Sequence, residues 1–127
     1  MFNDLFSLKG RIALVTGGSR GIGKMIAAGY LSAGAAKVYI TARKAGPCEE
    51  TAKELSARYD GECIALPIDI STLAGAELLA GEFKKREAKL DILVNNAGAA
   101  WGAEFDEFPE SGWDKVMNLN VKSPFFL

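Results

Sequence analysis

The sequence predicts an α/β fold, in which a parallel sheet is covered by helices on both of its faces. Short runs of apolar and β-branched residues alternate along the chain with longer segments whose apolar residues recur at helical spacing. The first apolar run ends directly in a cluster of glycines. This pattern suits a strand that is buried on both faces of the sheet. Right-handed crossovers between parallel strands then predict a doubly wound sheet with strand order 3-2-1-4.

The elements follow one another as strand and helix, four times. The four strands are expected at residues 11–16, 37–41, 62–68 and 91–95. Gly34 ends the first helix, Pro47 opens the second, residues 69–72 offer a cap for the third, and Pro109 with Ser111 begins the last. The apolar side chains expected along these helices, in chain order, are Ile22, Met25, Ile26 and Tyr30; Cys48, Ala52, Leu55 and Tyr59; Leu73, Ala76, Leu79, Ala80 and Phe83; and Trp113, Val116 and Met117.

Composition excludes several function classes. The chain has 127 residues, of which 49% are hydrophobic, enough for one domain or part of one. A net charge of −1 gives no basic surface for nucleic acid or for a membrane. The absence of histidine from the sequence excludes Ser-His-Asp and Cys-His nucleophile pairs and histidine metal sites.

Targeting signals are not expected. The first ten residues do not resemble a signal peptide, and no apolar run approaches the roughly 18 residues that cross a bilayer. Cys48 and Cys63 fit no metal-binding spacing. They are interpreted as buried or incidental thiols in a reducing compartment, so we expect a cytoplasmic protein.

A glycine-rich turn, residues 16–23, stands between the first strand and the first helix. In a doubly wound sheet a ligand phosphate meets a helix N-terminus here, where free N–H groups stabilise the anion and glycines let the backbone approach it. The simpler alternative is a tight turn without a ligand. A P-loop is disfavoured: Gly18–Lys24 fits its first seven positions, but Met25 replaces the Ser or Thr that holds Mg²⁺ and lies on the apolar stripe, as a core residue would.

Two arginines favour NADP over NAD as the cofactor. An NAD site usually places an acid after the second strand, where it bonds the ribose 2′-hydroxyl. This chain has Arg43 at that point, twenty residues after Gly23, and Arg20 inside the glycine turn. Guanidinium groups in these places suit a 2′-phosphate. The alternative is that both arginines are solvated surface residues.

Four motifs in register resemble the short-chain dehydrogenase/reductase family. They are the glycine turn, Asp69 after the third strand, the Asn95-Asn96-Ala97-Gly98 segment after the fourth, and Asn120 in the last helix. Phe6-Ser-Leu, the stretch from Asn96 to Gly102 and Ser111-Gly-Trp113 look most like β-ketoacyl reductases of rhamnolipid precursor synthesis, with sugar-acid dehydrogenases left open. The resemblance implies a Rossmann-type fold, a small carbonyl substrate, and assembly as a homodimer or homotetramer.

The resemblance also implies roles for the matched residues. The expected cofactor-binding residues are Gly17, Gly18, Ser19, Arg20, Gly21, Ile22, Gly23, Arg43, Asp69, Ile70, Asn96, Ala97 and Gly98. Asp69 would bond the adenine amino group, although a helix cap is the alternative for it. Asn95 would pin the fourth strand to the glycine turn. Asn120 is the expected catalytic residue, holding a water of the proton relay through a local break in the helix.

Three residues near these motifs have structural roles or roles that stay open. Asn118 is expected to be an ordinary helix residue, and Pro124 to add a bend. Trp101 would either wall the substrate pocket or pack within its loop.

The family's Ser and its Tyr-x-x-x-Lys pair do not occur in this sequence. We therefore expect residues 1–127 to be the NADP-binding N-terminal half of a reductase domain, inactive without the remainder. The alternative is a catalytically inactive NADP-binding or scaffold module. A Ser followed by Tyr-x-x-x-Lys in the coding sequence after Leu127 would support the enzyme, whereas a stop codon there would favour the module. Residues 92–94 would form an exposed apolar edge strand, and Phe125, Phe126 and Leu127 would lack a partner, which predicts that these residues alone aggregate or loosen.

Overall fold

The structure, a computed structural model, describes residues 2–127 and contains one parallel sheet. Its strand order is β3-β2-β1-β4, which confirms the predicted doubly wound order. The third and fourth strands end earlier than predicted, by two residues and one. The strands are β1 (Ile12–Thr16), β2 (Lys37–Thr41), β3 (Glu62–Leu66) and β4 (Ile92–Val94).

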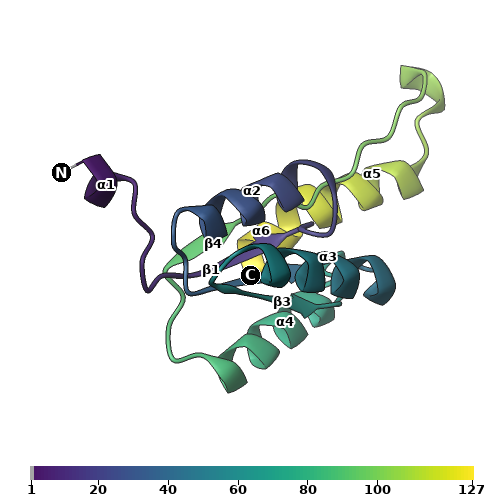
Figure 1. Cartoon of the computed structure of the whole chain (residues 1–127). Coiled ribbons are helices and arrows are strands. Elements are labelled where there is room, and N and C mark those ends of the chain that lie inside the picture. Colours follow the sequence, from purple (N-terminus) through teal and green to yellow (C-terminus); the bar gives the residue numbers. More distant parts are fainter. Residues whose placement is uncertain (1) are drawn as a thin grey trace.

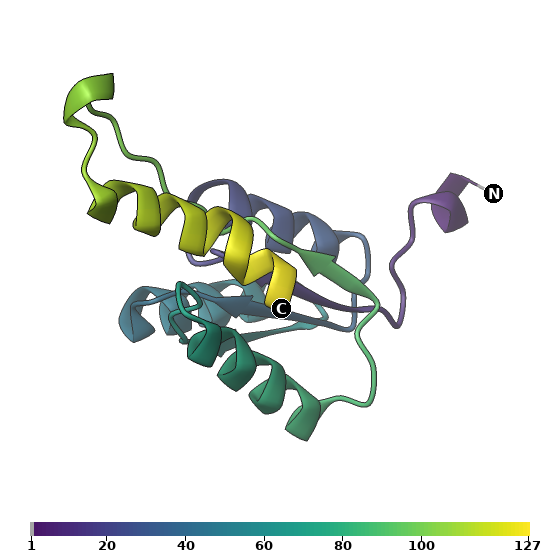
Figure 2. The same ribbon diagram turned by 180° about the vertical axis from the view of Figure 1, so that it is seen from behind.

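Helices cover both faces of the sheet (Figure 1). The helices α2 and α3 lie on one face, and α4 and the last helical segments lie on the other, which Figure 2 shows from behind. The helical elements are α1 (Phe2–Leu5), α2 (Gly21–Ser32), α3 (Ala45–Arg58), α4 (Leu73–Arg86), η1 (Phe105–Glu107), α5 (Glu110–Met117), η2 (Asn118–Lys122) and α6 (Ser123–Phe126).

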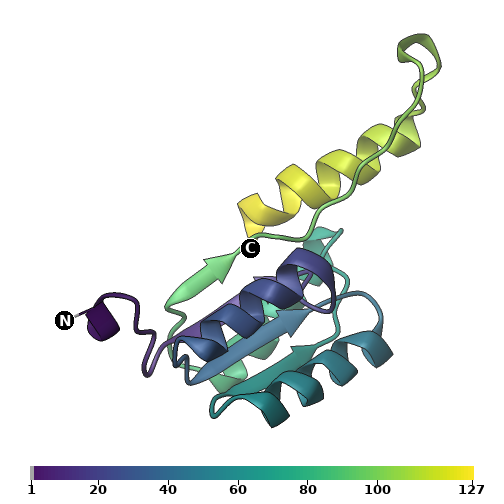
Figure 3. The ribbon, with the colours of Figure 1, turned by 45° about the horizontal axis from the view of Figure 1, so that its top comes forward.

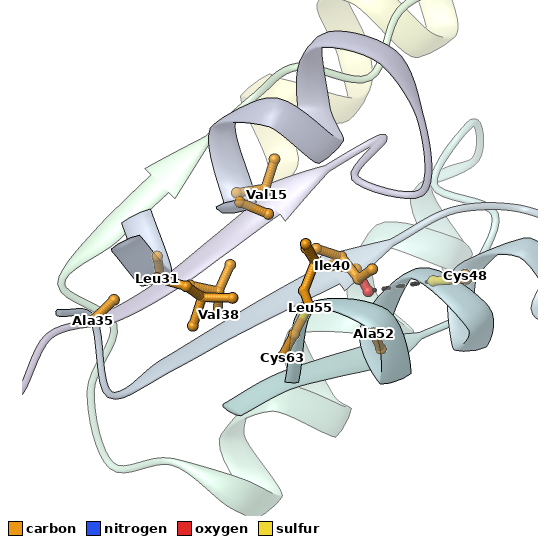
Figure 4. Close-up of a cluster of buried hydrophobic side chains, with 11 residues drawn as sticks. Val15, Leu31, Ala35, Val38, Ile40, Cys48, Ala52, Leu55 and Cys63 are labelled. Atoms are coloured by element: carbon orange, nitrogen blue, oxygen red, sulfur yellow. Dashed lines mark hydrogen bonds between the residues drawn. The ribbon is translucent and has the colours of Figure 1, made fainter. Parts of the chain in front are cut away.

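The α2–α3 face holds the larger core cluster (Figure 4). The prediction for α3 is confirmed, since Cys48, Ala52 and Leu55 are buried and Tyr59 packs beside them. Cys48 and Cys63 are buried free thiols, and burial raises the pKa of Cys63 to about 12. Both cysteines therefore serve as small core residues.

The prediction for α2 is partly wrong. Its buried residues are Gly23, Ala27 and Leu31, whereas Ile22 and Met25 are 66% and 65% exposed. These buried residues are four positions apart and so share one face of the helix. Two of them, Gly23 and Ala27, are small, so the helix packs closely on the sheet and turns Ile22 and Met25 outward. The interpretation of Met25 as a core residue fails, although it still lacks the hydroxyl of a P-loop.

The opposite face of the sheet, covered by α4 and the last helical segments, buries only some of the apolar residues predicted for it. Ala76, Leu79 and Phe83 of α4 are buried as expected, but Trp113 of α5 is 59% exposed. Leu127 packs against the cluster around Leu14, which corrects the expectation that it lacks a partner.

Strand β4 forms one edge of the sheet (Figure 3), and apolar residues there are exposed. Leu93 is 39% exposed, and Phe125 and Phe126 are exposed and stack edge to face on each other. Aggregation of these residues expressed alone stays a prediction. Among the helices of residues 2–127, none has both the length and the apolar character needed to cross a membrane.

Candidate cofactor site

The glycine turn bends sharply between β1 and α2. Gly17 and Gly21 adopt φ angles of +65° and +57°, which L side chains rarely adopt. A Cβ on Gly18 would lie 2.6 Å from the Ile40 side chain, and one on Gly23 would lie 2.1 Å from the carbonyl oxygen of Gly17. The sequence therefore needs glycine here for backbone shape and for close packing.

Hydrogen bonds tie this turn to the segment after β4. Asn96 Nδ2 donates to the carbonyl oxygens of Thr16 and Gly17, at 3.0 and 3.1 Å. The Thr16 hydroxyl oxygen accepts from the backbone N–H groups of Asn96 and Ala97, at 3.0 and 2.9 Å, and donates to the Val94 carbonyl. Asn96, and not Asn95 as predicted, pins the strand to the turn, because side chains alternate in direction along extended backbone. Thr16, which is buried, also joins the glycine turn to the segment after β4, and sequence reasoning missed this role.

A cavity of about 760 Å³ opens beside this turn, where the carboxyl ends of the parallel strands meet. Twelve of the predicted cofactor-binding residues line it, but Gly18 does not, because it packs on β2 instead. The predicted residues along the cavity are Gly17, Ser19, Arg20, Gly21, Ile22, Gly23, Arg43, Asp69, Ile70, Asn96, Ala97 and Gly98.

Sequence reasoning missed other lining residues. Thr41 ends β2, Ala42 and Lys44 follow it, and Ile68 and Ala99 lie in the segments after β3 and β4. The rule that ligands bind at the carboxyl ends of strands could have found them. Nothing in the local sequence signals the contributions of α5 and η2, because they depend on how the last helix packs.

The charge of the cavity wall is mainly positive. Arg20, Arg43, Lys44 and Lys115 line it together with one carboxylate, Asp69. Lys24, the lysine of the P-loop-like pattern, instead bonds Glu54 of α3 at 2.7 Å. The cavity therefore suits an anionic ligand, and Lys24 is not directed into it as a P-loop lysine would be.

Asp69 is an ionised acceptor at the cavity wall. Its Oδ1 accepts from the backbone N–H of Ser71 at 2.9 Å, and that bond is the main cause that lowers the pKa of the carboxyl. The N-cap of α4 is Thr72, whose hydroxyl oxygen accepts from the Gly75 N–H at 3.0 Å. The alternative interpretation of Asp69 as that helix cap is therefore wrong.

Asn120 lies in the π-helical segment η2, which confirms the expected local break in the helix. Its side-chain amide bonds the backbone of Ala99 twice, with Oδ1 accepting from the N–H and Nδ2 donating to the carbonyl, each at 2.8 Å. Asn120 is not a lining residue of the cavity, whereas Asn118, expected to be an ordinary helix residue, is. Pro124 has no N–H to give the Asn120 carbonyl, which lies four residues before it.

Trp101 packs against α5. A Cβ on Gly112 would lie 2.8 Å from three atoms of the indole, so the ring lies directly against α5. Lys115 Nζ stands 5.6 Å from the ring centroid. Trp101 does not line the cavity beside the glycine turn, and its role in a substrate pocket stays a prediction.

Comparison with known proteins identifies the family. The model of the short chain dehydrogenase family matches residues 11–127. The chain belongs to this family.

The relatives within the short-chain dehydrogenase family are reductases and dehydrogenases. The chain is 60% identical over 120 residues to the rhamnolipids biosynthesis 3-oxoacyl-[acyl-carrier-protein] reductase of Pseudomonas aeruginosa, covering 94% of this chain and 46% of that protein. It is 35% identical over 127 residues to the 2-dehydro-3-deoxy-D-gluconate 5-dehydrogenase of Dickeya dadantii, covering 100% of this chain and 49% of that protein.

A solved structure agrees with the fold. The Pseudomonas aeruginosa RhlG/NADP active-site complex matches with a TM-score of 0.89 at 60% identity, over 95% of this chain and 46% of that one. The resemblance to rhamnolipid-type reductases is thereby confirmed. The chain spans about half the length of the relatives it matches.

Proposed function

We propose that this chain binds NADP and serves an NADPH-dependent reductase that transfers hydride to a carbonyl carbon. The observation that carries the proposal is the cationic cavity wall at the end of β2, where Arg43 and Lys44 follow the strand and Arg20 reaches the same cavity. A 60% identical protein whose structure is an NADP complex supports it.

The residues of the cavity fit this cofactor. Glycine backbone at the start of α2 accepts a pyrophosphate without Cβ atoms in the way, and the helix N-terminus stabilises its charge. Arg20 and Arg43 bind the 2′-phosphate, and Lys44 adds a third positive charge beside them. Asp69 accepts from the adenine amino group, next to Ile70, and Ala97 and Gly98 border the ribose near the nicotinamide.

The bound nicotinamide supplies the hydride. Asn120 would then hold a water of the proton relay at its backbone carbonyl, since its side chain is committed to Ala99 and Pro124 offers that carbonyl no N–H. The serine, tyrosine and lysine of the family's chemistry would come from outside residues 1–127.

The proposed substrate is a 3-oxoacyl thioester or a related ketone, as the name of the 60% identical relative suggests. The similarity to a sugar-acid dehydrogenase keeps that class as a second candidate. The protein expressed from its complete coding sequence tests both. Oxidation of NADPH with a 3-oxoacyl thioester supports the proposal, whereas turnover of a sugar acid alone favours the second candidate, and NADP binding without turnover of either favours the inactive module.

The cellular setting is part of the same proposal. We place the protein in the cytoplasm as a homodimer or homotetramer, in keeping with buried free cysteines and with the family. Sedimentation of the complete protein measures the assembly state directly, and a monomer would contradict the proposed assembly.

A further inference from the structure

A threonine of α3 holds the glycine turn from the side opposite β4. Thr51 is 4% exposed, and its hydroxyl donates to the carbonyl oxygen of Ser19 at 2.6 Å. The two residues are 32 positions apart in sequence, so the bond joins separate elements. It is a short, partly buried contact, and its donor is a buried side chain of the kind that is costly to leave unpaired.

This bond lies directly before a cavity-lining arginine. Ser19 and Arg20 share one peptide unit, and both line the cavity. Arg20 has extended backbone, with φ of −157° and ψ of 171°, and stands as the N-cap of α2 without a side-chain cap bond. Holding the Ser19 carbonyl in place therefore fixes the plane of the peptide that joins Ser19 to Arg20, and with it the position of the Arg20 backbone nitrogen and Cα.

Electrostatics give this bond a second consequence. A carbonyl oxygen carries partial negative charge, so it would repel a phosphate if the peptide turned it into the cavity. The Thr51 hydroxyl holds that oxygen on α3 and satisfies it there. The opposite end of the same peptide, the N–H of Arg20, then points the other way, since the peptide is trans.

We propose that Thr51 is a positioning residue for cofactor selection, which sets Arg20 for the 2′-phosphate of NADP through the Ser19 carbonyl. The inference rests on the proposed NADP site. It assigns the selectivity of that site to a buried residue of α3 that does not itself line the cavity.

The test compares dissociation constants for NADPH and NADH in the protein expressed from its complete coding sequence. Thr51→Val removes the donor at nearly constant volume and is expected to weaken NADPH binding about tenfold, the contribution of one hydrogen bond, while NADH binding changes less than about twofold. Thr51→Ser keeps the hydroxyl and is expected to retain the preference. Thr51→Ala is the second variant in case the valine form does not fold.

Two controls separate positioning from general stability. Glu54→Gln removes the exposed ion pair to Lys24, which also joins α3 to α2, and is expected to leave both dissociation constants unchanged. In an Arg20→Ala background, Thr51→Val is expected to cause no further loss of NADPH affinity, because the two residues act in series.

The outcomes are distinct. Equal weakening of NADPH and NADH, or an unchanged NADPH preference in the valine and alanine forms, overturns the role of Thr51. If the unmutated protein prefers NADH, the proposed NADP site itself fails.

Discussion

Strands β1 and β4 are hydrogen-bonded neighbours in one sheet, yet they lie in different surroundings. Residues 13–16 of β1 are buried, whereas β4 has an exposed residue between two half-buried ones. Leu14 and Leu93 are partners in register, but Leu14 is 3% exposed and Leu93 is 39% exposed. Burial in this sheet thus depends on a strand's neighbours more than on its residue type.

The cause lies in the layers around each strand. β1 has a paired strand on both sides, with α2 packed on one face and the cluster of α4 residues on the other. Within residues 2–127, β4 pairs with β1 alone. The proposed cofactor site lies where these two regions meet, because the glycine turn follows β1 and Asn96 follows β4.

The largest expected effect compares the partnered leucines. Leu14→Ala should lower the free energy of unfolding by about 2–5 kcal/mol, because it removes a fully packed side chain from the core. Leu93→Ala should cost less than Leu14→Ala, because Leu93 is already 39% exposed. Denaturant unfolding of the two variants under identical conditions measures the difference, and equal losses would show that β4 is as well packed as β1.

A smaller effect is expected at the connection between the two regions. Asn96→Ala removes two hydrogen bonds to the glycine turn and should cost about 2 kcal/mol of unfolding free energy, while weakening NADPH binding. Asn95→Ala is the matched control and should stay within about 0.5 kcal/mol. A larger loss at Asn95 would restore the role that the sequence alone assigned to it.

The smallest effect concerns the opposite end of β2, far from the cofactor site. The Lys37 ammonium and the Tyr39 hydroxyl each donate a hydrogen bond to the Glu87 carboxylate at 2.7 Å. The bond from Lys37, followed by the bond from Tyr39, holds the pKa of the Glu87 carboxyl below the ordinary value. Burial, followed by the bond to Glu87, raises the pKa of Tyr39.

The sign of the pH dependence follows from this lowered pKa. Because the carboxylate is favoured in the folded state, its stabilisation is present above the unfolded pKa of about 4.3 and is lost as pH falls through the folded value. Unfolding free energies measured from pH 6 down to pH 3 should therefore decline less steeply in Glu87→Gln than in the unmutated chain. Parallel curves would contradict this coupling.

Sequence reasoning succeeded where local pattern decides the outcome. The glycine turn and the basic end of β2 follow from residues close together in the chain, and the strand order follows from the crossover rule for alternating strands and helices. It failed where side-chain direction or distant packing decides: it chose Asn95 over Asn96 and placed Met25 inward. Thr51 gave no signal at all, because its partner lies 32 residues away and only the packing of α3 brings them together.

The most direct test of the account is the cofactor preference of the protein expressed from its complete coding sequence. Arg20, Arg43 and Lys44 at the cavity, without an acid at the end of β2, predict that NADPH binds at least tenfold more tightly than NADH. Arg43→Ala should bring the two dissociation constants together. Calorimetric titration measures both, and equal affinities or tighter NADH binding in the unmutated protein would contradict the account.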